Sequence, residues 1–188
     1  MSAGGARGAI ILPWALGAIF LAGIVHISSV LLMPRFAQND AYVRLGGRTS
    51  GVTPLPDASV AQSMPFQDQQ AEYSVCQFDL DRAATRVRSN VTSDALVAIS
   101  FHDRTGRIFY STTDRAALRG KIDVRLLTPR QLDSVEASDP EDQTPQELRL
   151  TPPTQTGFVL VRALIEQPGG RAAARQAAGA VLCTTERE

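Results

Sequence analysis

One uncharged stretch near the amino terminus limits what this chain can fold into more than any other feature. Residues 9–33 (AIILPWALGAIFLAGIVHISSVLLM) carry no formally charged side chain and are apolar almost throughout. A helix of this length reaches roughly 37 Å at about 1.5 Å per residue, and the hydrocarbon core of a bilayer is about 30 Å thick. The stretch therefore predicts a transmembrane helix after a short tail over residues 1–8.

A cleaved signal peptide is the alternative interpretation of this stretch. Its apolar run exceeds the core of an ordinary signal peptide, which is about 7–15 residues long. The exit over residues 33–38 (MPRFAQ) offers no convincing small-x-small cleavage site, so an uncleaved signal anchor is preferred. Flanking charges leave the orientation open, because the excess of arginine after the stretch mildly favours a cytoplasmic domain under the positive-inside rule.

Small and polar side chains share one face of the predicted helix: Ala18, Ala22, His26 and Ser29. Small residues let helices approach closely, so a membrane partner is expected to pack on this face. A histidine inside a membrane raises the hypothesis of a proton relay or a metal ligand. The preferred interpretation is that His26, near the exit, hydrogen-bonds locally or with a lipid headgroup.

The rest of the chain has the size of a single domain. Roughly 120 of the 188 residues remain after the anchor and its flank. Basic and acidic residues balance at 19 each, which argues against nucleic acid as a partner. Glycines and prolines interrupt residues 34–70, which predicts a linker or surface strap with a short helix over residues 40–45. Residues 71–188 are expected to form the soluble domain.

Alternating apolar residues predict several short strands in this domain. The expected strands cover residues 73–80, 84–89, 96–102, 107–111, 122–127, 147–150 and 157–166. The first two are predicted to pair as a hairpin. The third and fourth form another hairpin, in which Gly106 supplies the positive φ that the turn needs.

Three helices are expected among the strands. The first covers residues 115–119, the second begins at a capping box of Thr128 and Gln131, and an Ala-rich third helix over residues 171–182 ends at Cys183. Hairpins outnumber long crossovers in this arrangement. The predicted fold class is therefore α+β: a single N-terminal transmembrane helix followed by one domain with a mainly antiparallel β-sheet and a few short helices.

The chain carries few groups that are typical of a metal or cofactor site. It has two histidines and two cysteines, with no Cys-x-x-Cys pair and no histidine pair at ligand spacing, so neither a metal nor a cofactor is predicted. Phosphate loops, dinucleotide fingerprints and nucleophile elbows are missing as well. These features favour a role without catalysis.

A weak catalytic candidate lies at the end of the third predicted strand. His102, Asp103 and Arg104 lie at the end of a buried apolar run. Nearby in the same predicted hairpin are Ser100, Tyr110, Ser111 and Asp114. A histidine beside an acid could act as a general base. Adjacent strand residues point to opposite faces, however, and Asp103 followed by Gly106 is also what an ordinary turn requires. Turn formation is the preferred role.

The two cysteines allow two interpretations. A disulfide between Cys76 and Cys183 would close a loop of about 100 residues and could stabilise the domain by about 4 kcal/mol. Such a bond requires an oxidising compartment such as the periplasm. Two unrelated buried thiols are the alternative, and the cysteines alone do not decide between the two.

Two runs of the domain resemble a bacterial family of unknown function: residues 74–89 (SVCQFDLDRAATRVRS) and 96–116 (LVAISFHDRTGRIFYSTTDRA). The chain is similar to the short, membrane-anchored alphaproteobacterial form of the family numbered twelve-fifty-four among domains of unknown function. The similarity continues through residues 122–129 and 157–163 and includes Cys183.

The resemblance implies an envelope location and no established activity. Members of this type often accompany a companion from another family of unknown function, twelve-fourteen, which implies a protein partner. The recurrence of the Cys76 and Cys183 positions in such proteins implies a disulfide. After Leu80 the chain departs from the family pattern, because residues 81–84 (DRAA) replace a Gly-Pro turn. A pocket built around that turn therefore does not carry over.

The residues and the resemblance together predict a single-pass protein of the bacterial inner membrane with a periplasmic domain. The domain is expected to bind a protein partner or another envelope component, without catalytic activity. The alternative is a periplasmic enzyme or small-ligand-binding domain that uses the hairpin from His102 to Asp114.

Overall fold

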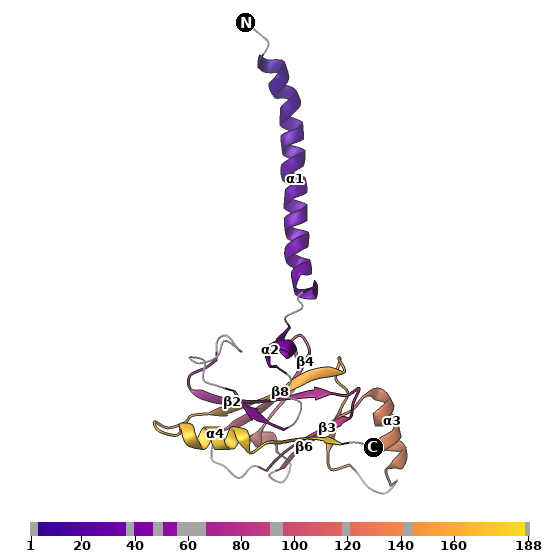
Figure 1. The fold of residues 1–188 in the computed structure, drawn as a ribbon, viewed down its shortest axis with the longest axis vertical. Helices are drawn as coiled ribbons and strands as arrows, with labels where there is room; N and C mark the ends of the chain where they lie inside the picture. Colours follow the sequence, from indigo (N-terminus) through magenta and orange to yellow (C-terminus); the bar gives the residue numbers. More distant parts are fainter. Residues whose placement is uncertain are drawn as a thin grey trace. The chain divides into compact units, whose positions relative to one another are not determined.

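The computed structural model describes residues 4–36, 40–46, 51–55, 67–90, 96–117, 121–140 and 145–186. The chain divides into two compact units, Met1–Gln38 and Asn39–Glu188, and each is described by itself. In chain order the elements (Figure 1) are α1 (Gly4–Phe36), α2 (Ala41–Arg44), β1 (Thr53–Pro54), β2 (Ala71–Asp79), β3 (Ala84–Asn90), β4 (Val97–Asp103), β5 (Ile108–Thr113), the 3₁₀ turn η1 (Asp114–Ala116), β6 (Lys121–Leu126), α3 (Pro129–Ser138), β7 (Leu148–Leu150), β8 (Thr156–Leu164), α4 (Arg171–Gly179) and β9 (Leu182–Glu186).

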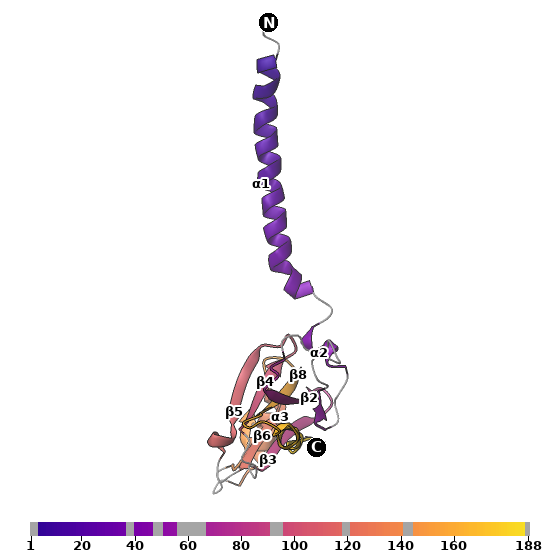
Figure 2. The ribbon, with the colours of Figure 1, turned by 90° about the vertical axis from the view of Figure 1, so that its left-hand side faces the viewer.

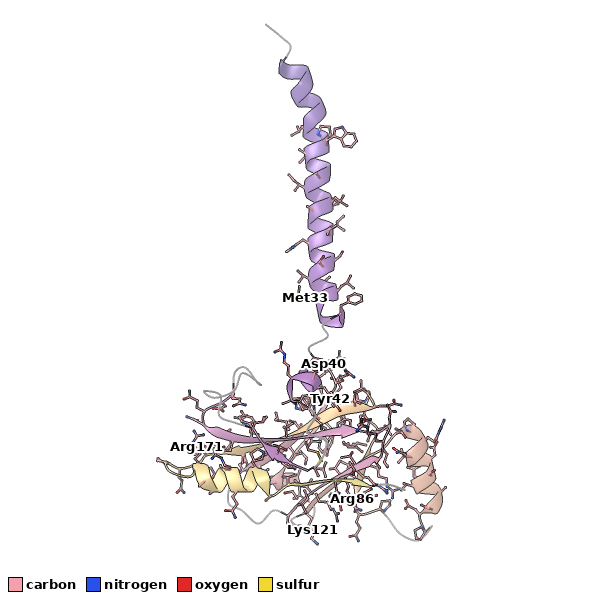
Figure 3. All side chains as sticks on the ribbon, viewed as in Figure 1. Met33, Asp40, Tyr42, Arg86, Lys121 and Arg171 are labelled. Atoms are coloured by element: carbon pink, nitrogen blue, oxygen red, sulfur yellow. A yellow bond between two sulfur atoms is a disulfide. The ribbon has the colours of Figure 1, made fainter. Side chains whose placement is uncertain are left out.

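The first unit contains α1, a continuous helix that confirms the expected N-terminal apolar helix. Its span Leu12–Met33 has 22 residues and a mean hydropathy of 2.2, and none of it is buried. The span is long and apolar enough to cross a membrane. Figure 3 shows its side chains projecting around the helix as far as Met33.

The second unit contains two β-sheets. The five-stranded sheet has the order β1-β2-β8-β4-β5, and all its neighbouring strands are antiparallel. The four-stranded sheet has the order β7-β6-β3-β9, and only β6 and β7 are parallel among its described pairs. The predicted α+β class with mainly antiparallel pairing is confirmed, although the strands divide between two sheets.

The core lies between the two sheets (Figure 2). The five-stranded sheet contributes Phe78, Ile99 and Phe101, and the four-stranded sheet contributes Val87 and Leu126, all shielded from solvent. Burial of an apolar side chain of this size stabilises the fold by about 1.5–3 kcal/mol. Because strand side chains alternate, the residues between these positions point to the outer faces of the sheets.

The hairpin of β4 and β5 confirms the second predicted strand pair. Its register places Ser100 opposite Ser111 and Phe101 opposite Tyr110, with an irregularity between Phe101 and His102. Gly106 in the turn has a φ of +96°, a conformation that side chains with a Cβ rarely adopt. The helix expected over residues 115–119 is a 3₁₀ turn, η1, in its described part.

The first predicted hairpin is wrong. β2 pairs with β8 along its whole length, and β3 pairs with β6 and β9 in the other sheet. The turn between them passes from one sheet to the other, with Leu80 and Ala83 buried and Asp79 accepting backbone hydrogen bonds from Arg82 and Ala83. Period-two alternation fits both the predicted hairpin and the observed pairing. It indicates which face of a strand is buried, but not which other strand pairs with it.

The predicted end of the last helix is also wrong. α4 ends at Gly179, and residues 182–186 form β9, which pairs with β3. Cys183 is buried on the core side of β9, whereas Leu182 is 58% exposed. This alternation and the threonines that follow favour a strand, since β-branched residues pack well on a pleated surface.

A surface strap follows the edge and the outer face of the five-stranded sheet. We use this name for residues 40–46 and 51–55, which contain α2 and β1. Asp40 caps α2, where its Oδ1 accepts from Val43 N at 2.9 Å. Leu45 and Leu55 are buried against Val75 and Phe158 in a second apolar cluster. The predicted short helix at residues 40–45 thus has its counterpart in α2, and residues 56–66 lie outside the described part.

Candidate functional site

His102 lies near the end of β4, on the outer face of the five-stranded sheet. Its Nε2 is 2.9 Å from Ser100 Oγ, and its Nδ1 is 3.0 Å from the backbone oxygen of Gly106. A carbonyl oxygen can only accept, so Nδ1–H donates to Gly106. In the neutral ring Nε2 is then an acceptor for the Ser100 hydroxyl, which also lies 3.3 Å from the backbone oxygen of Leu160 as an alternative acceptor. The imidazole also stacks on Phe158, with ring centroids 4.6 Å apart.

Burial favours the uncharged form of this imidazole. His102 is 8% exposed. Burial lowers its pKa below the usual 6.5, while the carbonyl of Gly106 and the charge of Asp103 partly oppose that effect. A neutral imidazole that accepts from a serine hydroxyl is the chemical pairing of a nucleophile with its base. Ser100 and His102 therefore have the atoms needed for a catalytic pair.

Asp103 does not take part in that pair. Its Oδ1 accepts hydrogen bonds from Thr105 N at 2.9 Å, Thr105 Oγ1 at 2.7 Å and Arg107 N at 2.9 Å. Burial alone would raise the pKa of Asp103, but these hydrogen bonds outweigh it and hold the pKa below its usual value. Asp103 builds the turn, as the preferred interpretation of the sequence expected.

The other members of the sequence-predicted constellation are also separated from His102. Tyr110 lies opposite Phe101, with ring centroids 5.7 Å apart, and packs against the core. Asp114 lies beyond β5 in η1 and accepts from the backbone of Arg115 at 2.8 Å. The structure thus brings Ser100 to His102 and directs Tyr110 to the opposite face of the sheet.

The surface strap closes over the turn of this hairpin. Asp40 Oδ2 pairs with Arg104 Nε at 2.6 Å, and the Arg104 guanidinium lies 5.6 Å from the centre of the Tyr42 ring. The backbone oxygen of Tyr42 accepts from Gln77 Nε2, a side chain that is fully buried. Figure 3 labels Asp40 and Tyr42 at α2 above the sheet. Burial raises the pKa of Tyr42, which stays protonated at neutral pH.

Cys76 and Cys183 form a disulfide within the core. Their Cα atoms are 6.5 Å apart, and their separation in the sequence is 107 positions. Cys76 belongs to β2 and Cys183 to β9, so the bond joins the two sheets. The disulfide is part of the packing of the domain.

Ala18, Ala22, His26 and Ser29 lie within the continuous helix α1 and are exposed. Their spacing places them on one face, as expected from the helical period. A partner for this face stays a prediction.

A row of arginines, which the sequence patterns did not predict, crosses the outer face of the four-stranded sheet. Arg149, Arg125 and Arg86 are in register on β7, β6 and β3. Arg86 donates to both oxygens of Asp123 at 2.8 Å and also pairs with Glu147 at 3.0 Å. Three basic side chains therefore lie side by side among carboxylates.

Helix α3 is attached beside this row mainly at its two ends. Thr128 and Gln131 form the predicted capping box, with contacts of 2.9 and 3.2 Å. At the other end, Asp139 accepts from both Nη atoms of Arg149. The Arg149 hydrogen bond holds the pKa of the Asp139 carboxyl below its usual range. Every residue of α3 is described, and none is buried.

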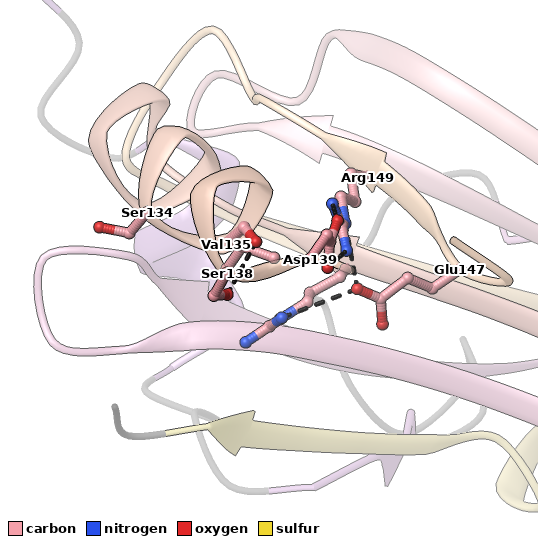
Figure 4. A pocket seen from close by; sticks show the side chains of 7 residues that line it. Ser134, Val135, Ser138, Asp139, Glu147 and Arg149 are labelled. Atoms are coloured by element: carbon pink, nitrogen blue, oxygen red, sulfur yellow. Dashed lines mark hydrogen bonds and ion pairs between the residues drawn. The ribbon is translucent and has the colours of Figure 1, made fainter. Parts of the chain in front are cut away.

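A cleft of about 440 Å³ separates α3 from the sheet. It is lined by Arg125, Ser134, Val135, Ser138, Asp139, Glu147 and Arg149. Figure 4 shows Val135 and Ser138 on the helix side and Glu147 and Arg149 on the sheet side. Its size lies within the range of about 300–1,000 Å³ that is usual for ligand pockets. Two guanidinium groups and two carboxylates line the same space.

The signal for this cleft in the sequence is slight. Asp123 and Arg125 are two residues apart on one strand, and Glu147 and Arg149 are two residues apart in the strand predicted over residues 147–150, so each pair is expected to share a face. That spacing could have indicated a charged outer face. It could not have indicated that β6 and β7 are neighbours, on which the cleft depends.

No protein-family model and no curated protein matches the chain. Among solved structures, the VPA0106 protein from Vibrio parahaemolyticus is similar, with a TM-score of 0.47 and 9% identity over 65% of this chain and 29% of that one. An uncharacterised protein from Burkholderia cenocepacia has a TM-score of 0.44 and 15% identity, over 72% of this chain and 34% of that one. The chain thus spans about a third of these structures.

Proposed function

We propose that this chain is a single-pass protein of a bacterial inner membrane whose domain is an interaction module in the periplasm. The apolar span Leu12–Met33 supports the anchor, since it is long enough to cross a bilayer. The resemblance to the family numbered twelve-fifty-four supports the envelope location. Tethering raises the concentration of the module for neighbours at the same membrane surface.

The disulfide supports the periplasmic side. Cys76 and Cys183 are joined within the core, and disulfides persist in oxidising compartments. The arginine excess after α1 favours the opposite orientation only mildly. Most cytoplasms keep cysteines reduced, so we give the disulfide more weight than the arginine excess when we assign the orientation of the domain.

The cleft beside α3 is the observation that carries the binding role. A helix that buries none of its own residues adds little to the core, whereas the cleft it forms brings charged and hydroxyl groups together. A companion from the family numbered twelve-fourteen is the proposed partner. The cleft is the proposed contact surface for that partner.

A blocking substitution tests this role. Ser138→Trp places a large ring in the cleft, while Ala137→Trp adds the same ring at an exposed neighbour that does not line it. The full chain, tagged and purified from membranes, should enrich an envelope partner, and Ser138→Trp should abolish that enrichment while Ala137→Trp keeps it. Equal enrichment by both variants would contradict binding at the cleft.

A second candidate function is catalysis by Ser100 and His102, which the 2.9 Å contact between them favours. A fluorophosphonate probe modifies serines that a neighbouring base activates. If the pair is catalytic, the probe should label the full chain and lose its target in both Ser100→Ala and His102→Ala. Absence of labelling from the unmodified chain would argue against this candidate and leave the interaction module.

A further inference from the structure

Strand β5 forms an open edge of the five-stranded sheet (Figure 2). Within the part of the chain that the structure describes, β4 is the only strand that pairs with it. The irregularity in this pair falls between Phe101 and His102, so the register is regular over residues 110–113 of β5. An edge strand presents backbone N–H and C=O groups to which a further strand can bind.

The hydrogen bonds of the β4–β5 hairpin show which groups of β5 face outward. Asp103 N donates to Arg107 O, so the odd-numbered residues of β4 direct their backbone groups toward β5. Thr112 lies opposite an odd-numbered residue and therefore faces β4. Because backbone groups alternate along a strand, Ser111 and Thr113 direct theirs away from β4. Neither makes a backbone hydrogen bond with a described residue outside this strand pair.

β5 lacks the features that usually protect an edge strand. Its sequence, IFYSTT, contains no charged residue and no proline, and Ile108 is 57% exposed. The edge strands β1 and β7 have only two and three residues, and β1 includes Pro54. The edge strand β9 carries the charged Glu186. Short length, charge and proline discourage edge pairing, so β5 is the described edge best suited to accept another strand.

We propose that β5 pairs with β5 of a second copy of this chain, antiparallel and with Thr112 on the two-fold axis. In this register Ser111 of each copy lies opposite Thr113 of the other, and each such pair exchanges both N–H···O bonds. Thr112 lies opposite Thr112 of the second copy. Hydroxyl residues therefore face hydroxyl residues along the contact, which is a favourable cross-strand combination.

The charges beside β5 agree with a second copy in this register. Arg107 precedes the strand, and Asp114 and Arg115 follow it. In the proposed register Asp114 and Arg115 fall opposite uncharged residues of the second copy, and Arg107 lies beyond the paired part. Moving the register by two residues would instead place Arg107 opposite Arg115, and like charges in that position are unfavourable.

The size of this contact explains why the anchor matters for it. β5 has six residues, so the paired edge buries far less than the total of about 1,600 Å² that is standard for a stable interface. Two domains free in solution should therefore pair weakly. The proposed membrane anchor, on which this step rests, confines both copies to one surface and raises their effective concentration.

Cysteine cross-linking in membranes that contain the full chain tests this pairing. Thr112→Cys places two thiols across the two-fold axis at a Cα separation of about 4.5 Å, which a disulfide can bridge. Oxidation should therefore give a covalent dimer of the chain. Thr185→Cys places a thiol at an exposed position on the edge strand β9 and carries the same anchor. This control should give at least about tenfold less dimer.

A lysine on the edge provides a second variant. Ser111→Lys, combined with Thr112→Cys, adds a charge at the centre of the contact and should reduce the covalent dimer at least about tenfold. Thr185→Lys in the same Thr112→Cys chain should leave the dimer unchanged. Ser111 and Thr185 are both exposed, so both lysines can extend into solvent without disturbing the core.

Hydrogen exchange gives a measurement that needs no substitution. The unmodified full chain is placed in vesicles of phosphatidylethanolamine and phosphatidylglycerol at low and at high density. The amides of Ser111 and Thr113 should exchange at least about tenfold more slowly at high density, because pairing satisfies them. The amide of Thr112 already faces β4 and should not change. This result decides the question even if Thr112→Cys does not fold.

Three outcomes would overturn the pairing. The first is equal cross-linking of Thr112→Cys and Thr185→Cys, and the second is exchange of Ser111 and Thr113 that does not depend on density. The third is a cross-link from Thr112→Cys to a different protein, which would assign the edge to a foreign strand. Partner enrichment that Ser138→Trp abolishes could still stand in each case, so failure of this inference differs from failure of the proposed function.

Discussion

At His102 the fold places an imidazole between a serine hydroxyl and a backbone carbonyl, with an aromatic ring stacked on one side. Each contact satisfies a polar atom that would otherwise be buried without a partner. The same contacts that make the residue resemble a catalytic base also hold the end of β4 to its turn. Protonation would give the buried His102 ring a positive charge, so the stability of the domain should depend on pH through this residue.

The first prediction concerns the pH dependence of stability. The folded state lowers the pKa of His102 below 6.5, so the unfolded chain binds the proton more readily. The free energy of unfolding should therefore be highest above pH 6.5 and fall as the pH drops below it. In the fragment 39–188 His102 is the only histidine. Urea unfolding between pH 7.5 and about pH 5 should show this slope, and His102→Gln should flatten it; an unchanged slope would contradict the assignment.

The second prediction concerns Gly106. Its φ of +96° is unfavourable for any residue with a Cβ, and a Cβ there would lie 3.3 Å from the Cβ of Ala41 in the strap. Gly106→Ala should therefore cost about 1–2 kcal/mol in the urea unfolding of the fragment 39–188. Gly179→Ala, where a Cβ meets nothing within 4 Å and φ is not positive, is the control and should cost less than Gly106→Ala.

At the level of elements, local sequence patterns predicted most of the strands but did not predict which strands pair with each other. The turn of β4 and β5 was predictable because Gly106 and Asp103 lie within it. The partners of β2 and β9 depend on residues about 80–100 positions away, and alternation does not encode that choice. The cleft beside α3 was missed for the same reason, since it needs the parallel pairing of β6 and β7.

The third prediction concerns α3. Because none of its residues is buried, its stability depends on its ends more than on packing. Thr128→Ala removes the cap and should lower the free energy of local opening by about 1 kcal/mol. Hydrogen exchange of the α3 amides should accelerate about fivefold while β4 and β8 stay protected. Ser134→Ala lies on the same helix but leaves both ends intact, so it should not accelerate the exchange of the α3 amides. An equal loss of protection in α3, β4 and β8 would contradict a helix that opens locally.

The fourth prediction concerns the surface strap. Leu45, directly after α2, is 1% exposed against Val75 and Phe158, whereas Val43 within α2 is 46% exposed. Leu45→Ala should destabilise the fragment 39–188 by about 2–5 kcal/mol, because it leaves a cavity under the strap. Val43→Ala should cost under about 0.5 kcal/mol. Equal effects of the two variants in urea unfolding would show that the strap does not contribute to the stability of the domain.

At the level of the whole molecule, the disulfide links the fold to the compartment. Cys76 and Cys183 join the two sheets across 107 residues, and a loop of that length gives a stabilisation of about 4–5 kcal/mol when chain entropy dominates. The chain contains no other cysteine. A thiol measurement on the full chain therefore reports on this bond alone.

The last prediction follows from that bond. Thiols of the full chain, alkylated in denaturant without reductant directly upon lysis, should be unreactive until a reductant is added, if the domain lies on the oxidising side of the membrane as we propose. Both cysteines should then react after unfolding under reducing conditions. Cys76→Ala with Cys183→Ala should lower the midpoint of urea unfolding to that of the reduced domain, and the oxidised domain should exceed both. Two thiols that react without reductant in freshly isolated chain would contradict the periplasmic orientation and support the cytoplasmic one that the arginines after α1 mildly favour.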